Sequence, residues 1–262
     1  MSARARSARG MRPEPIAWTP ATAYAVGIAA TDGNLGRDGR SVSLGSMDRE
    51  QVETFLHCVG RLGARISEQE GPYFRTQLSD RSLHVFLTEA GLTPNKSLTL
   101  GALVVPEVLF WDLARGLLDG DGSILNYVHN PIKKTYPDYS YERLQVVFNT
   151  ASRLHAEWIQ EQFRRRGISS ALLTTVRKTP EQSAARVLFV VRMGKHSSIA
   201  ALASMYRDPS APSLKRKWQK WDAFLKRYSR QEAIDEARGT LASRRSHAAL
   251  DRAKSSDDRH LN

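Results

Sequence analysis

The feature that most constrains the fold is a run of small residues that occurs twice in the chain. Residues 24–35 (YAVGIAATDGNL) align with residues 113–124 (LARGLLDGDGSI), and Gly27 then matches Gly116. Glycine and alanine remove the side-chain bulk that would keep two helix backbones apart, and Gly120 extends this small surface in the second run. We therefore expect two helices that pack closely side by side along these glycines.

Each of these helices is expected to end on an acid, Asp32 in the first and Asp121 in the second. Close packing brings the two carboxylates together, where they repel each other unless a cation lies between them. Two hard oxygen ligands suit Mg²⁺, or Mn²⁺, that keeps several of its waters. A calcium loop counted from Asp119 is set aside, because its twelfth position is Asn130 and not the bidentate glutamate that such a loop needs.

The order of predicted elements also occurs twice. The first set has helices over 20–31, 48–63 and 80–92, a hairpin over 33–46 and strands around Ile66 and Phe74, with Asp48 as N-cap and Gly63 as the stop of the second helix. The second set has helices over 107–123, 153–167 and 195–206, and strands over 142–150, 171–176 and 186–193. Two αββαββα modules related by a pseudo-two-fold axis, with two antiparallel β-sheets, are the predicted α+β fold.

The module boundaries follow from this repeat. The first module covers 18–105 and the second 106–228. A basic tail, 1–17, and a polar tail, 229–262, flank them, and both are expected to be disordered because they are poor in aromatic residues.

Several predicted strands alternate between apolar residues on one face and polar residues on the other. Arg, Gln, Asn and Tyr can read base edges and bind phosphates where such a face enters a major groove. An ordinary solvated face is the alternative. The polar positions are Tyr73, Arg75, Gln77, Arg143, Gln145, Asn149, Arg186 and Arg192, and Lys133 and Lys134 stand in the loop 128–140.

Charge and composition limit the partners. The formal net charge of the chain is +12, most of it between residues 18 and 228, which favours a polyanionic partner, although many small proteins are basic for no specific purpose. The single cysteine, Cys58, excludes an internal disulfide and a zinc site built on several thiolates. No membrane span or secretory signal is recognisable, so we expect a protein of the cytoplasm, or of an organelle matrix if it is organelle-encoded.

With the motifs AVGIAATDG (25–33) and ARGLLDGDG (114–122), the chain resembles the LAGLIDADG homing endonucleases, in the form where one chain supplies both halves. The resemblance covers about residues 20–225, although Ala30 stands where the family often has an acid. It implies that Asp32 and Asp121 bind the metal. Asp119 matches the other acid of the motif, to which we assign helix capping or packing.

The resemblance also implies a basic residue near the cleavage centre in each half. The matching positions after the last helix of each half are Lys96 and Lys217, with Lys215 as a rival to the second. Ser46 and Thr150, at the ends of their strands, match positions where the family places polar residues near bound waters.

The implied function is a monomeric, sequence-specific endonuclease that cuts double-stranded DNA and belongs to an intron or another mobile element. The resemblance also implies that the two sheets form a DNA-binding saddle along the duplex. Two alternatives stay open: a maturase that binds intron RNA, and a DNA-binding regulator that no longer cleaves. Phosphate contacts are expected from basic residues outside the strands, namely Arg164, Arg165, Arg166, Lys215, Arg216 and Lys220.

Overall fold

The computed structural model describes residues 15–69, 71–129, 141–177, 186–227 and 239. Most of the two predicted tails, and the loop lysines Lys133 and Lys134, lie outside these residues. The first module consists of α1 (Pro20–Asp32), β1 (Gly33–Leu35), β2 (Ser41–Ser46), α2 (Arg49–Cys58), β3 (Ile66–Gln69), β4 (Tyr73–Ser79) and α3 (Arg81–Glu89), followed by the 3₁₀ turns η1 (Lys96–Leu98) and η2 (Glu107–Leu109). The second consists of α4 (Phe110–Gly120), β5 (Ser123–His129), β6 (Tyr141–Thr150), α5 (Arg153–Arg165), β7 (Ala171–Arg177), β8 (Arg186–Arg192), α6 (Lys195–Met205) and α7 (Lys215–Arg227).

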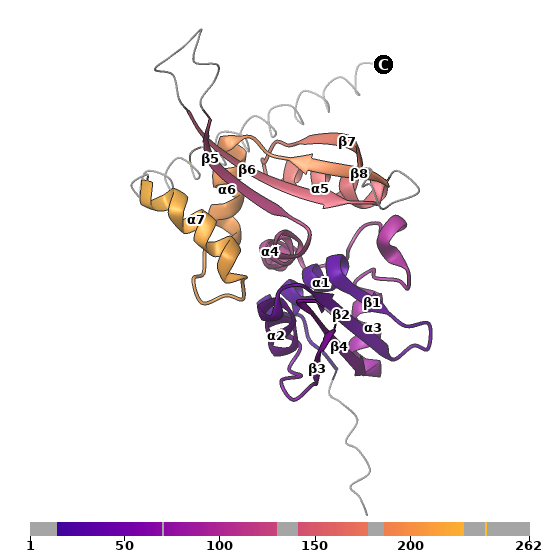
Figure 1. The fold of residues 1–262 in the computed structure, drawn as a ribbon. Helices are drawn as coiled ribbons and strands as arrows, with labels where there is room; N and C mark the ends of the chain where they lie inside the picture. Colours follow the sequence, from indigo (N-terminus) through magenta and orange to yellow (C-terminus); the bar gives the residue numbers. More distant parts are fainter. Residues whose placement is uncertain (1–14, 70, 130–140, 178–185, 228–238, 240–262) are drawn as a thin grey trace, which may run out of the picture.

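The two modules share one topology. The strand orders are β1-β2-β4-β3 and β5-β6-β8-β7, and every pair of neighbouring strands is antiparallel. Helices α2 and α3 pack on the first sheet, and α5 and α6 on the second. Figure 1 shows the sheets on either side of the α1 and α4 helices. The predicted duplicated α+β fold with two antiparallel sheets is confirmed.

The α1 and α4 helices form the centre of the molecule and touch through their glycines. Helix α1 starts at Pro20, with Thr19 as its N-cap. A Cβ atom built on Gly27 would lie 2.4 Å from the carbonyl oxygen of Leu113, and one built on Gly116 would lie 2.1 Å from that of Tyr24. Neither backbone tolerates a side chain at this crossing, so the small residues act as the sequence predicted.

One hydrophobic core extends through both modules. Every residue of α1 from Thr22 to Ala30 is buried, so this helix has no solvent face. The same cluster continues through α4 and the helix-covered faces of both sheets. No helix in the described ranges is long and apolar enough to cross a membrane.

Two sequence expectations about helices are wrong. Helix α2 ends at Cys58 rather than running to Gly63, because Gly60 takes up a left-handed conformation (φ 67°) and Arg61 N–H bonds back to Leu56 O at 2.8 Å. Helix α7 lies in a segment for which no element was predicted. Its apolar residues, which include Trp221, recur at helical spacing but stand among many lysines and arginines, and the helix packs along β5.

Candidate active site at the ends of the paired helices

The two predicted acids lie at the same end of the helix pair. Asp32 is the last residue of α1 and Asp121 directly follows α4. A Cβ atom on Gly120 would lie 1.9 Å from Thr31 Oγ1 and 2.9 Å from Asp32 Oδ2, so the end of α4 presses against the Asp32 carboxylate. The pKa of Asp121 is raised to about 6, mainly by desolvation of the carboxylate and also by the negative charge of Asp32. Part of the residue remains exposed.

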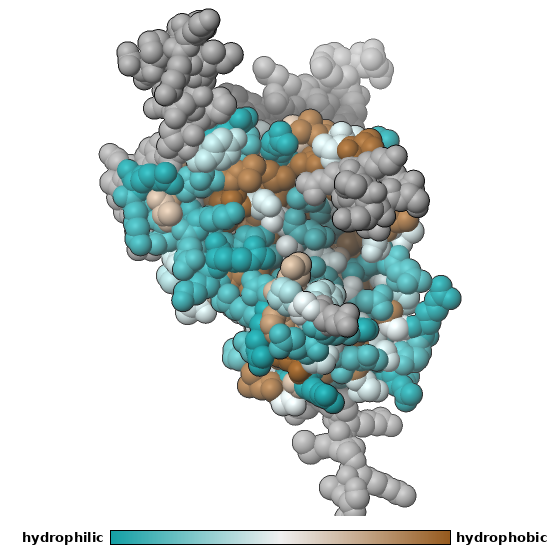
Figure 2. Space-filling view, viewed as in Figure 1, coloured by the Kyte–Doolittle hydropathy of each residue, from teal (hydrophilic) through white to brown (hydrophobic). Residues whose placement is uncertain are grey.

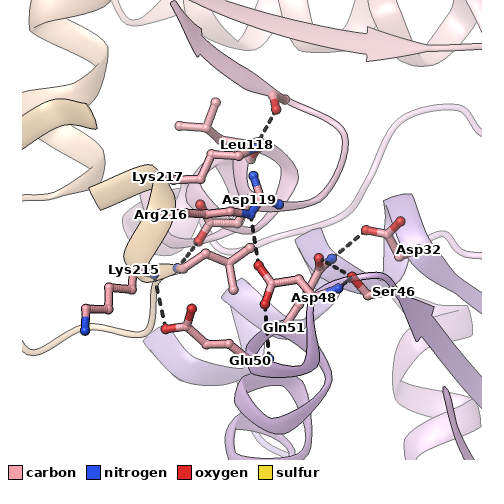
Figure 3. A network of polar contacts seen from close by, with 12 residues as sticks. Asp32, Ser46, Asp48, Glu50, Gln51, Leu118, Asp119, Lys215, Arg216 and Lys217 are labelled. Atoms are coloured by element: carbon pink, nitrogen blue, oxygen red, sulfur yellow. Dashed lines mark hydrogen bonds and ion pairs between the residues drawn. The ribbon is translucent and has the colours of Figure 1, made fainter. Parts of the chain in front are cut away.

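A buried glutamine holds Asp32 in place. Gln51, in the first turn of α2, donates a hydrogen bond from Nε2 to Asp32 Oδ2 at 2.6 Å, and Thr31 Oγ1 donates to the same oxygen at 3.0 Å. Burial raises the pKa of Asp32, and these two hydrogen bonds act against that rise. Gln51 Oε1 in turn accepts a hydrogen bond from Ser46 Oγ at 2.9 Å, and Figure 3 shows this chain of contacts. Gln51 was not predicted from the sequence to belong to the site.

The two predicted lysines occupy equivalent positions. Lys96 Nζ donates to the carbonyl oxygen of Gly33, and Lys217 Nζ donates to that of Gly122. Each of these glycines directly follows a motif acid, so the same contact is made in both modules. Both lysines are buried, and burial lowers the pKa of each ammonium group to about 8. Lys215, the alternative to Lys217 at this position, is exposed. Lys217 is therefore the structural counterpart of Lys96.

Asp119, the other acid of the second motif, has the packing and capping position to which the sequence assigned it. Its side chain is fully buried, and Oδ2 accepts hydrogen bonds from Tyr24 Oη and from the backbone N–H of Leu214, both at 2.8 Å. Leu214 immediately precedes α7, the helix that carries Lys217. Asp119 therefore fixes the start of that helix.

A buried arginine also holds the segment that leads to α7. Arg115 on α4 is 1% exposed and donates to Pro212 O at 2.7 Å, to Met205 O, and to the Asp112 carboxylate at 2.8 Å. Removing one partner of such a buried charge would be strongly destabilising. This arginine was not identified from the sequence.

The second module has a histidine where the first has Gln51. Asp48 caps α2 and Ser152 caps α5, and the third residue after each cap is Gln51 and His155, respectively. His155 Nδ1 bonds to Gly101 O at 2.8 Å rather than to Asp121. Within the described parts of the chain, no group donates a hydrogen bond to the Asp121 carboxylate. The two halves of the site are therefore unequal.

A cavity of about 290 Å³ opens beside Asp121. Thr150 and Asn149 line it, and Asn149 Nδ2 donates to the backbone oxygen of Asp121 at 3.1 Å. Ser46 and Thr150 make the same local contact, because each hydroxyl accepts from the backbone N–H of the following N-cap residue. The cavity gives solvent, or a bound group, access to this acid.

The wild-type protein is expected to lose stability at low pH because of His155, and the substitution His155→Gln should remove this loss. Burial lowers the pKa of His155 to about 4, whereas histidine in an unfolded chain titrates near 6.5. Between these values the unfolded chain binds the proton and the folded chain does not. Stability is therefore full above about pH 6.5 and falls by up to about 3 kcal/mol as the pH drops to 4.

Urea unfolding of both proteins across this pH range measures the effect. Asp119 and Asp121, whose raised pKa values give a slope of opposite sign, act in both proteins, so the difference between the proteins isolates His155. The exposed His57 on α2 supplies a control, His57→Gln. Equal loss of stability in wild type and His155→Gln would contradict the prediction.

The residues predicted to read DNA lie on the sheet faces that the helices leave uncovered. Tyr73, Arg75 and Gln77 are exposed on β4. Four residues on the second sheet are partly exposed: Arg143, Gln145, Asn149 and Arg192. The side chain of Arg186 lies outside the described part of the chain.

Part of the predicted set of phosphate-contacting residues is wrong. Arg166 is 7% exposed, its guanidinium lies 3.6 Å from the centre of the Phe110 ring, and it forms an ion pair with Glu107 at 2.6 Å. It is a packing residue. Arg164 and Arg165 pair with one glutamate on α5, in the helix layer behind the second sheet.

The remaining basic residues of that set belong to α7. Arg216 forms an ion pair with Asp48 at 2.9 Å, which joins α7 of the second module to the start of α2 in the first (Figure 3). Lys215 and Lys220 are exposed. Five members of the set are therefore exposed, and Arg166 is the buried one.

No protein-family model and no curated protein matches the chain. Among solved structures, it is similar to mesophilic variants of the homing endonuclease I-DmoI (11% identity over 72% of this chain and 96% of that chain, TM-score 0.43) and to the meganuclease I-SmaMI (11% identity, 86% and 99%, TM-score 0.48). It is also similar to full-length DUF199/WhiA from Thermatoga maritima (12% identity, 87% and 69%, TM-score 0.47). Such low identities carry no conclusion about activity. The paired motif helices, the repeated element order and the two sheets give this chain the two-module LAGLIDADG fold that its motifs predicted.

Proposed function

We propose that this protein is a sequence-specific DNA endonuclease that hydrolyses both strands of a duplex with a divalent metal. One observation carries the proposal: two motif acids meet at the end of the helix pair, and each is followed by a glycine whose carbonyl binds a buried lysine. The pseudo-two-fold arrangement presents one acid and one lysine to each strand. A single chain supplies both halves, so the active form is a monomer.

The donor set suits a hydrated divalent cation. Within the described residues, no three His, Cys, Asp or Glu side chains gather in a way that could hold a metal by themselves. The two carboxylates of Asp32 and Asp121 would hold the ion, with water and phosphate oxygens as its other ligands, as Mg²⁺ prefers. The bound metal would supply an activated water and neutralise charge on the phosphate.

The side chains around the acids have separate roles. Gln51 fixes the orientation of Asp32 through its hydrogen bond at 2.6 Å. Lys96 and Lys217, with pKa values of about 8, carry mostly positive charge at neutral pH and offset the negative charge that develops on each scissile phosphate. The carbonyl contacts hold both ammonium groups in place before DNA binds.

The sheet faces would carry the recognition of the target. Arg75 and Gln77 are of the types that form paired hydrogen bonds with guanine and adenine in the major groove. A net charge of +12 adds attraction to the phosphate backbone, and that attraction weakens as salt is raised.

Cleavage of a randomised duplex DNA library tests the proposal. The wild-type protein is incubated with Mg²⁺ or with a chelator, and the DNA ends are sequenced. Defined double-strand breaks that require Mg²⁺ are the expected result. Retention of a specific sequence without breaks would instead favour a DNA-binding regulator, and binding of a structured intron RNA alone would favour a maturase.

One observation favours the regulator as the second candidate. Asp32 is held by Gln51, whereas the histidine at the equivalent position of the second module points to Gly101 and leaves Asp121 without such support. A protein under no selection for cleavage would tolerate this loss. The sequencing of ends separates the two candidates.

A further inference from the structure

Equivalent positions on the two sheets can be assigned from the strand register. In the first module Ser46, the last residue of β2, pairs with Phe74 of β4. In the second module Thr150, the last residue of β6, pairs with Phe189 of β8. Both pairs end their ladders next to the capped helix that follows. Counting along the strands from these two pairs assigns to each residue of the first sheet the equivalent residue of the second.

The uncovered face of the first sheet is polar at most of these positions. Arg75 on β4 lies between its neighbours Gly45 on β2 and Ser67 on β3. Ser43 and Gln77 form the next pair of the same face. This face offers hydrogen-bonding groups to any partner.

Four of the equivalent positions of the second sheet are apolar, whereas Arg192 takes the place of Gln77 and Asn149 that of Gly45. Val190 takes the place of Arg75, and its neighbour on β7 is Leu173 in place of Ser67. The remaining replacements are Leu188 for Tyr73 and Val147 for Ser43. We call Val147, Leu173, Leu188 and Val190 the apolar patch. On β8 only the arginines Arg186 and Arg192 were predicted from the sequence to face DNA.

The apolar patch is accessible through its two leucines and lies beside the candidate active site. Val147 and Val190 form its floor, Leu188 is partly exposed, and Leu173 is 37% exposed. Asn149, which pairs with Val190, donates to the backbone of Asp121. Figure 2 shows hydrophobic surface over the second sheet and mainly hydrophilic surface over the first.

We infer that the two modules read their half-sites by different chemistry, and that the apolar patch recognises thymine methyl groups near the centre of the target. This inference rests on the proposed function. In the major groove the 5-methyl of thymine is the apolar group that distinguishes an A·T pair, and aliphatic side chains contact it. At the position of Val190 the first module has Arg75 instead, a residue of the type that binds guanine. The target is therefore asymmetric, with a T·A-rich half-site on the side of Asp121.

DNA is favoured over a protein partner by what surrounds the patch. Arg192 lies next to Val147 in the register, and Arg143 and Gln145 continue the same face of β6. An apolar protein surface would bury these charged and polar groups without partners, which is costly. A duplex offers them phosphates and base edges and offers the patch methyl groups.

Replacing thymine by deoxyuridine tests the inference, because only the methyl group is removed. A duplex selected from a randomised library by binding, with Ca²⁺ in place of Mg²⁺, is synthesised with deoxyuridine in one half-site or the other. Substitution on the side of the apolar patch is expected to weaken binding by about fourfold per contacted methyl group. The same substitution on the side of Arg75 should leave affinity within about twofold, because the contacts expected there are hydrogen bonds.

The substitutions Leu173→Asn and Leu188→Asn provide the matching change in the protein. Neither residue is fully buried. Each variant should bind the normal duplex more weakly than the wild type and should lose sensitivity to deoxyuridine. Specific binding with no effect of deoxyuridine in either half-site would overturn the inference and leave the endonuclease proposal intact. Failure to select any DNA sequence would overturn the proposed function itself.

Discussion

Replacing Gly116 by alanine is expected to destabilise the protein by about 3 kcal/mol or more, because the added methyl group collides with backbone rather than with a movable side chain. Its Cβ would lie 2.1 Å from the carbonyl oxygen of Tyr24 and 3.0 Å from the Cα of Gly27. Alanine stabilises a helix by roughly 1 kcal/mol relative to glycine, so the net effect has the opposite sign to the helix propensity. The helices would have to separate along their whole contact.

Thermal or urea unfolding measures this effect, and a fall of about 10 °C in Tm corresponds to it for a chain of this size. Gly63 provides the control, since a Cβ there meets nothing within 4 Å and its backbone is not in the left-handed region. Gly63→Ala should therefore change stability by no more than about 0.5 kcal/mol. A Gly116→Ala protein as stable as this control would show that the helices are not in contact.

The substitutions Asp32→Asn and Asp121→Asn are each expected to abolish double-strand cleavage, with a loss in rate of about 10³-fold. Asparagine keeps the shape of the side chain but removes the negative charge that would bind the metal. Loss of charge also ends the repulsion that contributes to the raised pKa of Asp121. Both variants should thus fold at least as stably as the wild type when no metal is present.

Two measurements separate loss of the site from loss of the fold. Mg²⁺ should raise the Tm of the wild type and not that of either variant, because only the wild type keeps both carboxylates. Glu53→Gln, an exposed charge removal on α2, should retain cleavage. Full activity in either aspartate variant would exclude the proposed role of that residue.

The helix pair and its acids could be predicted because they depend on local sequence that is repeated. Glycine is unfavourable in the middle of a helix, so Gly27 and Gly116 indicate close packing of two helices. In both repeats the acid follows the glycine at the same spacing. The family resemblance pointed to Lys96 and Lys217, which follow α3 and α6, respectively. The side chains then reach the equivalent carbonyl oxygens, those of Gly33 and Gly122.

Other features depend on contacts that no local pattern reveals. Gln51 and His155 occupy equivalent positions in the two modules, but they differ in residue type and in hydrogen-bond partner. Their equivalence is recognised only when α2 and α5 are aligned from their N-caps. Arg166 resembles the exposed arginines beside it, and only the fold brings it over Phe110. Helix α7 was missed because its apolar residues are interrupted by basic ones.

The shared core has a consequence for how this protein can arise and change. Helix α1 is buried from Thr22 to Ala30, and Gly27 packs against the backbone of α4. A separated first module would therefore expose the face around Gly27 to water. Each module is thus an obligate partner of the other, like a subunit of a permanent dimer joined by a tether. Replacement of one module by the module of a related protein would succeed only if the incoming helix carried a glycine at the matching position. The two helices of the pair are therefore constrained to change together.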